Sequence, residues 1–563
     1  MTIQRELQRA ATRAIKGAFP DIELEAEVVA STQSGFGHYQ CNNAMRLAKM
    51  VGQSPRDVAA RIADHLDDLL IDRVEVAGPG FLNITLCSEA LSERLISQGS
   101  DRRFGVAKPT SPKRVIVEFS SPNVAKELHV GHLRSTIIGE ALARLFEFLG
   151  GDVIRLNHVG DWGTQFGMLI SYIKSDHPEA ISRPEQFDLP TLMRWYREAK
   201  RAFDADVTFQ EASRREVVSL QSGDPDSKGV WEAICAISRR AYDEIYHLLD
   251  AQLSERGESF YNEMLPQVAA ELTEKGIAIR SDGALCAFAD GYETPMIVQK
   301  SDGGYTYDTT DLAALKHRID DERADRIIVV TDNGQRLHFD LLRAVAIAAG
   351  WLDESKTQFD HVTFGVVLGP DGKKFKTRSG ETERLIDLLG AASQKARAIM
   401  EERGASGDID EVSQTIAMNA VKYADLSCLR TKDYVFSYDR MLRFEGNTAA
   451  FLMYSYVRVQ GIKRRVGKTI TPDAIRLDHP SEVALGLHLL RFSEVVEMVA
   501  RDLLPNRLCD YLYELAEHFN AFFRDCRVEG SDEEASRLAL CDLTARLLQQ
   551  GMNLLGLKTV EQM

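Results

Sequence analysis

The sequence predicts a multidomain α/β protein whose central domain is a doubly wound parallel sheet. Three observations support this prediction: a strand–helix–strand unit at residues 115–156, two further strand-to-helix units between 326 and 381, and the loss of strand patterns after about residue 405. Short β-branched runs that alternate with helical periodicity are typical of parallel sheets covered by helices.

The first unit begins with the apolar run Val115–Phe119, which Ser120-Ser-Pro-Asn123 interrupts. A helix is then indicated by apolar residues at every fourth position: Leu133, Ile137, Ala141, Leu145 and Leu149. Gly150-Gly151 predicts a left-handed end to this helix, and Val153–Leu156 resumes as a strand. Two strands joined by a helix in this way form a parallel pair with a right-handed crossover.

Two more units follow the same plan. Arg326–Thr331 leads to a helix that ends near Gly350, and His361–Leu368 leads through a basic loop to a helix near Glu381. A charged, helix-rich insertion at about 173–290 separates them from the first unit.

The regions on either side have different characters. Residues 1–105 combine helical periodicity with strand-like stretches at Arg73–Val76 and Phe81–Leu86, so we expect an α+β domain. Residues 106–404 form the central domain, and 405–563 form an all-helical domain with amphipathic patterns at 411–430, 447–465, 483–503, 508–524 and 534–556.

Composition excludes some classes of protein and leaves others open. No apolar run approaches the ~20 residues of a membrane helix, and the N-terminus lacks the apolar core of a secretory signal. The eight cysteines are scattered without a C-x-x-C pair, so we expect reduced thiols, no bound zinc or other metal, and a cytoplasmic location. The net charge of −16 argues against nucleic-acid binding unless one face is basic.

A pair of histidines lies where the first strand meets its helix. His129-Val-Gly-His132 occupies the turn at the positive end of the helix dipole, where open parallel sheets bind ligands. Both imidazoles can face a phosphate group from such a turn. The alternative is ordinary helix capping, because an H-x-G-H sequence also occurs by chance.

The residues around this turn resemble the "HIGH" motif of class I aminoacyl-tRNA synthetases. The segment Ser121–Thr136, with its S-P-N-x-x-K lead and L-R-S-T tail, is similar to the arginyl branch of that family. Further segments match in order along the chain: Asn157–Gly167, Tyr305–Asp311, Lys374–Gly380, Asn447–Tyr454 and Asn553–Met563.

The resemblance implies an arginine–tRNA ligase with a Rossmann-like catalytic domain. Such an enzyme activates arginine with ATP, accompanied by Mg²⁺, and transfers it to the 3′-terminal adenosine of tRNA-Arg. Arginine, ATP and tRNA-Arg would be its partners, without a membrane, and the family is usually monomeric. The resemblance also implies that arginine activation requires bound tRNA.

Phosphate chemistry is then expected from His129 and His132 together with the basic loop residues Lys374, Lys376 and Arg378. The second lysine of the family's "KMSKS" loop would stand at Thr377, so the resemblance assigns its role to Lys126. For both cationic segments the alternative is a solvated surface.

The remaining expected sites follow the motifs. Arginine would be held by Glu118, Asn123, Tyr307, Asp311 and Gln335, since a guanidinium fork pairs with a carboxylate. Besides the two histidines, ATP would contact Gly131, Gly160, Asp161, Trp162 and Gly163. The tRNA would contact Phe81 and Asn83 near one end of the chain, and Phe451, Tyr454, Phe522, Phe523 and Met563 near the other.

Each assignment has a structural alternative. Asp311 could cap a helix, Glu118 could form a structural ion pair, and the aromatic residues could belong to the core. Other class I synthetases, a small nucleotidylyltransferase and an inactive tRNA-binding scaffold are competing hypotheses for the whole chain. An acidic pocket, the helical domain and the intact His129 and Asp311 favour the arginyl branch over these.

Overall fold

The computed structural model describes residues 2–31, 34–369, 371–373, 375, 383–404 and 408–563. It begins with an α+β block whose antiparallel sheet has the strand order β1-β2-β4-β3. Its elements are α1 (Ile3–Ala18), β1 (Val28–Ala30), β2 (Tyr39–Cys41), α2 (Ala44–Val51), α3 (Pro55–Ala63), β3 (Ile71–Ala77), β4 (Phe81–Leu86) and α4 (Ser88–Ser100). The expected strand-like stretches are confirmed as β3 and β4.

The centre of the molecule is a five-stranded sheet with the order β12-β11-β5-β6-β7, in which every neighbouring pair is parallel. The strands are β5 (Arg114–Glu118), β6 (Asp152–Asn157), β7 (Ser254–Glu255), β11 (Arg326–Asp332) and β12 (Gln358–Phe364). Helices α5 (Val130–Phe148), α12 (Tyr307–Asp320) and α13 (Arg336–Ala348) lie between them in the chain. The predicted crossover is confirmed, and Gly150 has the left-handed φ of 90° expected of a helix end.

Helices cover both faces of this sheet because alternate strand residues point to opposite sides. One apolar core takes Val115, Val117, Ile328 and Val330, and the other takes Ile116, Ile327 and Val329. The run of consecutive apolar residues in each strand therefore reports a sheet buried on two sides.

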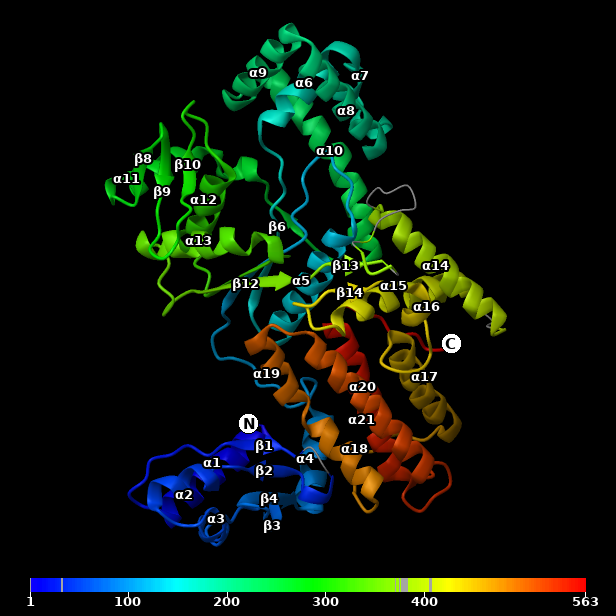
Figure 1. Cartoon of the computed structure of the whole chain (residues 1–563). Coiled ribbons are helices and arrows are strands. Elements are labelled where there is room, and N and C mark those ends of the chain that lie inside the picture. Colours follow the sequence, from blue (N-terminus) through cyan, green and yellow to red (C-terminus); the bar gives the residue numbers. More distant parts are fainter. Residues whose placement is uncertain (1, 32–33, 370, 374, 376–382, 405–407) are drawn as a thin grey trace.

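The first part of the insertion forms the outer end of the molecule, and its longest helix, α10, runs back to the centre, whereas its last part lies beside α12 and α13 (Figure 1). Its helices are α6 (Thr164–Asp176), α7 (Glu179–Ser182), α8 (Leu189–Ala205), α9 (Val207–Gln221), α10 (Pro225–Leu248) and α11 (Leu265–Glu274). The helix-rich expectation is confirmed by these helices, and a small antiparallel sheet of β8 (Ala278–Ser281), β9 (Ala284–Ala287) and β10 (Met296–Gln299) follows them. Four-residue strands are too short to show a clear alternation.

Helices dominate the last third of the chain, as expected. They are α14 (Leu385–Glu402), α15 (Ile409–Leu426), α16 (Tyr438–Met441), α17 (Ala449–Val466), α18 (Pro480–Leu490), α19 (Phe492–Asp502), α20 (Asn506–Asp525) and α21 (Glu534–Leu554). The pattern at 483–503 proves to be two helices with a break at Arg491. One short strand remains, β14 (Tyr434–Val435), which pairs with β13 (Val367–Leu368).

The α+β block packs against this helical region beside α18 (Figure 1). The Gln98 side chain of α4 donates a hydrogen bond to the Leu489 carbonyl at 3.0 Å. Within the described part of the chain, no helix is long and apolar enough to cross a membrane.

Candidate active site

The candidate site lies at the carboxyl edge of the central sheet, where the strand order reverses. From β5 the chain continues to β6 on one side, and it later returns to β11 on the other side. Open α/β sheets bind ligands in the crevice outside such a point. The loop 119–129 leaves β5 here and carries Lys126 and His129, while His132 follows on the first turn of α5.

The two histidines of this loop cap α5 reciprocally. His129 Nδ1 accepts a hydrogen bond from the Gly131 amide at 3.1 Å, and His132 Nδ1 accepts one from the His129 amide at 3.1 Å. A neutral imidazole that accepts at Nδ1 carries its proton on Nε2. Burial, the neighbouring His129 and the charge of Lys126 lower the pKa of His132 to about 3. His132 is therefore a neutral hydrogen-bond donor at the positive end of the helix dipole.

Three residues of the same loop have left-handed backbone conformations without being glycine. The φ angles are 70° at Ser120, 46° at Ser121 and 59° at Ala125. Each costs roughly 1–2 kcal/mol and persists only where neighbouring groups hold it. Their amides donate hydrogen bonds of 2.9, 3.0 and 3.1 Å to the side chains of Ser135, Asn157 and Ser238, respectively.

Helix α10 of the insertion supports the loop from behind. The Tyr242 hydroxyl reaches the carbonyls of Asn123 at 2.8 Å and Lys126 at 2.7 Å, and Tyr246 contacts the Ser120 hydroxyl at 2.8 Å. Together with Ser238 these residues repeat every four positions and so lie on one helix face. The sequence analysis missed them, although this spacing of polar and aromatic residues was the available sign.

Removing the Tyr242 hydroxyl should make the loop 119–129 more mobile without leaving a cavity in the core. In Tyr242→Phe we expect the rate of amino-acid activation to fall about tenfold, since misplaced catalytic groups are costly. Unfolding should become easier by about 1–2 kcal/mol, the cost of a lost buried hydrogen bond. Pre-steady-state kinetics and thermal unfolding measure the two effects. Tyr172→Phe, which loses a hydrogen bond to Glu198 within the insertion, is the matched control; equal rates in both variants would contradict the supporting role.

Of the expected cations, Lys126 lies among the described residues. It is exposed beside the histidine turn, whereas Lys374, Lys376, Thr377 and Arg378 lie outside the described residues. Farther along the chain, Arg384 forms a backbone bridge with His129, and the Leu385 amide donates to the Leu128 carbonyl at 2.9 Å. The start of α14 is thus bonded to the histidine turn.

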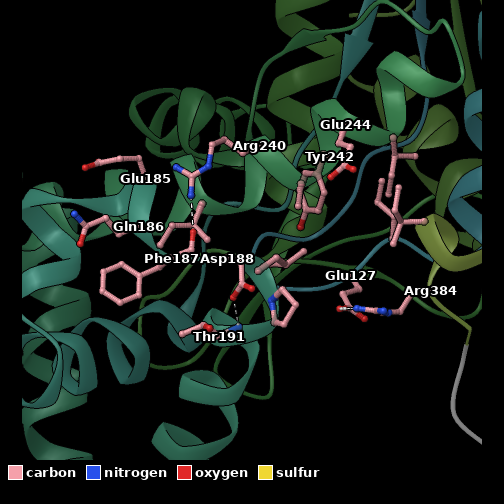
Figure 2. Close-up of a pocket in the computed structure, with 17 residues that line it drawn as sticks. Glu127, Glu185, Gln186, Phe187, Asp188, Thr191, Arg240, Tyr242, Glu244 and Arg384 are labelled. Atoms are coloured by element: carbon pink, nitrogen blue, oxygen red, sulfur yellow. Dashed lines mark hydrogen bonds and ion pairs between the residues drawn. The ribbon is translucent and has the colours of Figure 1, made fainter. Parts of the chain in front are cut away.

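Figure 2 shows the back of this junction, where Glu127 lies 3.6 Å from Arg384. The hollow there measures about 520 Å³ and is lined by α10, the start of α8 and the loop before α5. None of the residues expected to bind a substrate lines it. The hollow therefore lies behind the catalytic loop and is distinct from the crevice.

On the other side of the loop, Asn123 lies directly against Gly160. The two form a parallel bridge, and a Cβ atom on Gly160 would lie 2.2 Å from the Asn123 side-chain oxygen. Only glycine leaves room for this side chain. Asn123 is itself exposed.

The expected carboxylate for arginine lies nearby on α12. This helix begins at Tyr307, which places Tyr307 and Asp311 one turn apart as expected. Asp311 Oδ2 accepts a hydrogen bond from His338 Nε2 at 2.7 Å, and its Oδ1 lies 3.5 Å from His158 Nε2. Gln335 is exposed at the start of α13, one turn before His338.

Glu118 has a different environment from the one expected. Its carboxylate lies 2.6 Å from the Arg318 guanidinium of α12, and both side chains are buried. The high cost of a buried acid predicted a substrate contact, but Arg318 already supplies the opposite charge. A contact between Glu118 and arginine remains a prediction.

A further acid that the sequence analysis missed is Glu258, which follows β7. Burial, Asp311 and Asp161 raise its pKa to about 8. No motif marks this residue, because the insertion brings it from a distant part of the chain. The raised pKa reflects mainly the burial of this carboxyl, to which the negative charges of Asp311 and Asp161 add.

The expected adenosine side contains one structural residue. Asp161 is buried and accepts hydrogen bonds from the amide and hydroxyl of Ser259 at 2.8 and 2.6 Å. It therefore orders the loop after β7, and a contact between Asp161 and ATP stays a prediction. Trp162 is partly buried beside Trp231, and Gly163 has a φ of 133° that favours glycine.

Two of the expected RNA contacts are buried and need correction. Phe522 is 0% exposed in the helical core, and Asn83 is 4% exposed with its oxygen bonded to Gln40. The sequence pattern predicted the correct element for each residue. It did not predict that each side chain would lie on the buried face of that element. The expected contact Phe523, next to Phe522, is 38% exposed, and Tyr454 is 43% exposed.

The exposed aromatic rings share one arginine. The Arg458 guanidinium lies 4.7 Å from the Tyr454 ring centre and 5.4 Å from that of Phe523. Phe451, Met563 and, in the first block, Phe81 are partly buried. The combination of aromatic faces and a cation is typical of platforms that stack bases.

Among the described residues, no group of three or more His, Cys, Asp or Glu side chains is placed to hold a metal ion. All eight cysteines are free thiols.

Three family descriptions match the chain in succession. "Arginyl tRNA synthetase N terminal domain" matches residues 2–86, "tRNA synthetases class I (R), catalytic domain" matches 94–438, and "DALR anticodon binding domain" matches 452–563. The histidine turn and the α12 carboxylate both lie inside the second match.

Complete proteins and a solved structure are also similar. The chain is 52% identical to an arginine–tRNA ligase of Protochlamydia amoebophila, covering 98% of both chains, and 48% identical to one of Chlamydia caviae, covering 100% of both. The crystal structure of an arginyl-tRNA synthetase from Plasmodium falciparum superposes with a TM-score of 0.89 at 34% identity, over 100% of both chains.

Proposed function

The chain belongs to the arginyl-tRNA synthetase family and has arginine–tRNA ligase activity, and we propose that it performs this reaction at the crevice between β5 and β11. The observation that carries the proposal is that Asn123, on the loop that leads to His129, bridges to Gly160, while His158, two residues before Gly160, lies 3.5 Å from Asp311. The histidine turn offers donors for phosphate, and Asp311 offers an anion for a cationic side chain.

In the first step, a carboxylate oxygen of arginine attacks the α-phosphorus of ATP, and pyrophosphate leaves. His129 and His132 donate hydrogen bonds to the phosphate oxygens, where charge develops. Lys126 adds a cation, and Lys374, Lys376 and Arg378 act on the pyrophosphate. In the second step, a ribose hydroxyl of the tRNA's terminal adenosine attacks the carbonyl carbon, and AMP leaves.

Arginine is recognised at both of its ends. Asp311 pairs with the guanidinium, assisted by Tyr307. Asn123 and Gln335 hold the α-amino and carboxyl groups, and Glu118 acts through its pair with Arg318.

ATP binds across the start of α5. Gly131 and the helix amides approach the phosphates, while Gly160, Trp162 and Gly163 shape the adenosine pocket. Mg²⁺ enters as the counter-ion of ATP and belongs to the substrate.

Two regions hold the tRNA away from the crevice. Residues 405–563 bind the anticodon, and residues 1–105 approach the outer corner of the tRNA through Phe81, while 106–404 catalyse the reaction. We further propose that the protein acts as a cytoplasmic monomer without structural zinc.

Because the proposal assigns each substrate to its own region, the KM for each substrate tests it. Tyr454→Ala should raise the KM for tRNA-Arg by about 10- to 100-fold, since stacking of one base on an aromatic ring contributes roughly 1–3 kcal/mol. The KM values for arginine and ATP should change less than about twofold, since neither substrate reaches this ring. Aminoacylation kinetics with each substrate varied in turn give the three values.

Tyr454→Phe is the matched control, because it keeps the aromatic face and should retain most of the tRNA affinity. An unchanged KM for tRNA in Tyr454→Ala would make Tyr454 a packing residue and remove it from the RNA surface.

A further inference from the structure

His338, on the first turn of α13, connects two acidic residues of α12. Its Nε2 lies 2.7 Å from Asp311 Oδ2, and its Nδ1 lies 3.2 Å from Asp308 Oδ1. Its ring also lies beside Tyr307, with 5.3 Å between ring centres. The sequence motifs assigned no role to this histidine.

The contacts of His338 fix the orientation of the Asp311 carboxylate. One oxygen of Asp311 is taken by the imidazole, and the other lies near His158. Asp308 is held in turn, because its second oxygen accepts a hydrogen bond of 2.8 Å from the Ile297 amide of β10. A continuous connection therefore runs from the backbone of β10 through Asp308 and His338 to Asp311.

The imidazole also balances charge. Burial would lower the pKa of His338, but its hydrogen bonds to Asp308 and Asp311 outweigh burial and raise the pKa to about 9. Burial likewise favours a protonated Asp311, but the bond from His338 and the nearby His158 keep the pKa of Asp311 below its usual value. Two carboxylates and one imidazolium leave a single negative charge, which matches one guanidinium.

The surroundings of His338 include other titratable groups. Tyr307 faces it from α12, and His361 lies near it on β12. Burial lowers the pKa of His361 to about 4, so this second histidine is neutral at physiological pH. Arg318 is nearer to Glu118, with which it is paired.

We propose that His338 is a positioning residue for arginine specificity, which holds Asp311 ionised and aimed so that one oxygen remains for the substrate guanidinium. This inference rests on the proposed role of Asp311 in binding arginine. It does not require His338 to touch either substrate.

The test compares how the KM for arginine depends on pH in the parent, His338→Gln and Asp311→Asn. Aminoacylation is measured between pH 6 and pH 8 with saturating ATP and tRNA-Arg. Glutamine can donate a hydrogen bond to Asp311 but carries no charge. In His338→Gln, Asp311 should therefore take up a proton as the pH falls, and the KM for arginine should rise by about tenfold between pH 8 and pH 6. The parent should change less, because its imidazolium keeps the carboxylate of Asp311 ionised. Glu258, whose burial and acidic neighbours raise its pKa to about 8, titrates in the same range in both proteins, so the comparison with the parent removes its contribution.

Two controls separate this effect from other causes. His361→Gln makes the same substitution at a neighbouring histidine that hydrogen-bonds Thr331, so its pH profile should follow that of the parent. A merely structural role for His338 would change kcat, the KM for ATP and thermal stability together, without a pH slope that is specific to arginine.

The outcomes distinguish the two proposals. If Asp311→Asn leaves the KM for arginine unchanged, the proposed arginine pocket itself fails. If Asp311→Asn raises that KM but His338→Gln has the same pH profile as the parent, the role of His338 is overturned while the pocket stands.

Discussion

Replacement of Asp311 by asparagine is expected to raise the KM for arginine by about 100-fold or more, corresponding to roughly 3 kcal/mol of lost binding. The amide keeps the shape of the carboxylate but not its charge, and a charge-assisted fork to a guanidinium is about twice as strong as a neutral hydrogen bond. Glu118, the other carboxylate expected to bind arginine, is already paired with Arg318, so it cannot readily replace Asp311. The KM for ATP should stay within about twofold of the parent value, since ATP does not contact this carboxylate.

Asp320→Asn provides a matched control on the same helix. Asp320 lies near the end of α12, where it forms an exposed pair with Lys316 at 2.7 Å, so its loss should leave both KM values unchanged. Steady-state kinetics with arginine and with citrulline, its uncharged analogue, complete the comparison. An unaltered KM for arginine in Asp311→Asn would remove Asp311 from the pocket.

Replacement of Lys126 by methionine should reduce kcat for arginine activation by about 10²–10³-fold, the range observed when one oxyanion donor is removed. The KM values for arginine and ATP should change little, because the interaction strengthens only in the transition state. The structure gives this lysine a suitable position: it is exposed beside the histidine turn, and its charge is one of the influences on His132. Single-turnover formation of arginyl-adenylate measures the rate.

A second substitution examines the idea of compensation. Adding Thr377→Lys to Lys126→Met should recover part of the rate if the side chains at the two positions contact the same phosphate. Lys200→Met is a control, since Lys200 lies on the insertion surface and pairs with Asp204. Near-parental activity of Lys126→Met would assign the charge to Lys374 or Lys376 instead.

Local sequence patterns predicted the parts of the fold that depend on local chemistry. The apolar run at Val115–Phe119 corresponds to β5. The apolar residues at every fourth position after it correspond to α5, and Gly150 corresponds to the end of that helix. Tyr307 and Asp311 lie one turn apart, as their spacing predicts, because α12 begins at Tyr307.

The rest of the site depends on contacts between distant segments. Tyr242 reaches the catalytic loop from the insertion, and Arg318 neutralises Glu118 from another helix; spacing along the chain reports neither contact. The sequence also did not predict which of Phe522 and Phe523 is buried. Adjacent residues point to different sides of α20, and only the packing of that helix decides which side is buried. The two-residue strand β14 was missed because it pairs with a strand more than sixty residues away.

The central claim is that the chain activates arginine at the β5–β11 crevice, and that it does so only with its tRNA bound. Exchange of radioactive pyrophosphate into ATP, measured with each of the twenty amino acids in the presence and absence of tRNA-Arg, tests this most directly. We expect exchange with arginine alone and only when tRNA-Arg is present, since the basic loop has threonine at position 377 and the two regions that we propose to bind RNA lie on either side of the catalytic region. Full exchange with arginine in the absence of tRNA, or exchange with a different amino acid, would contradict the claim.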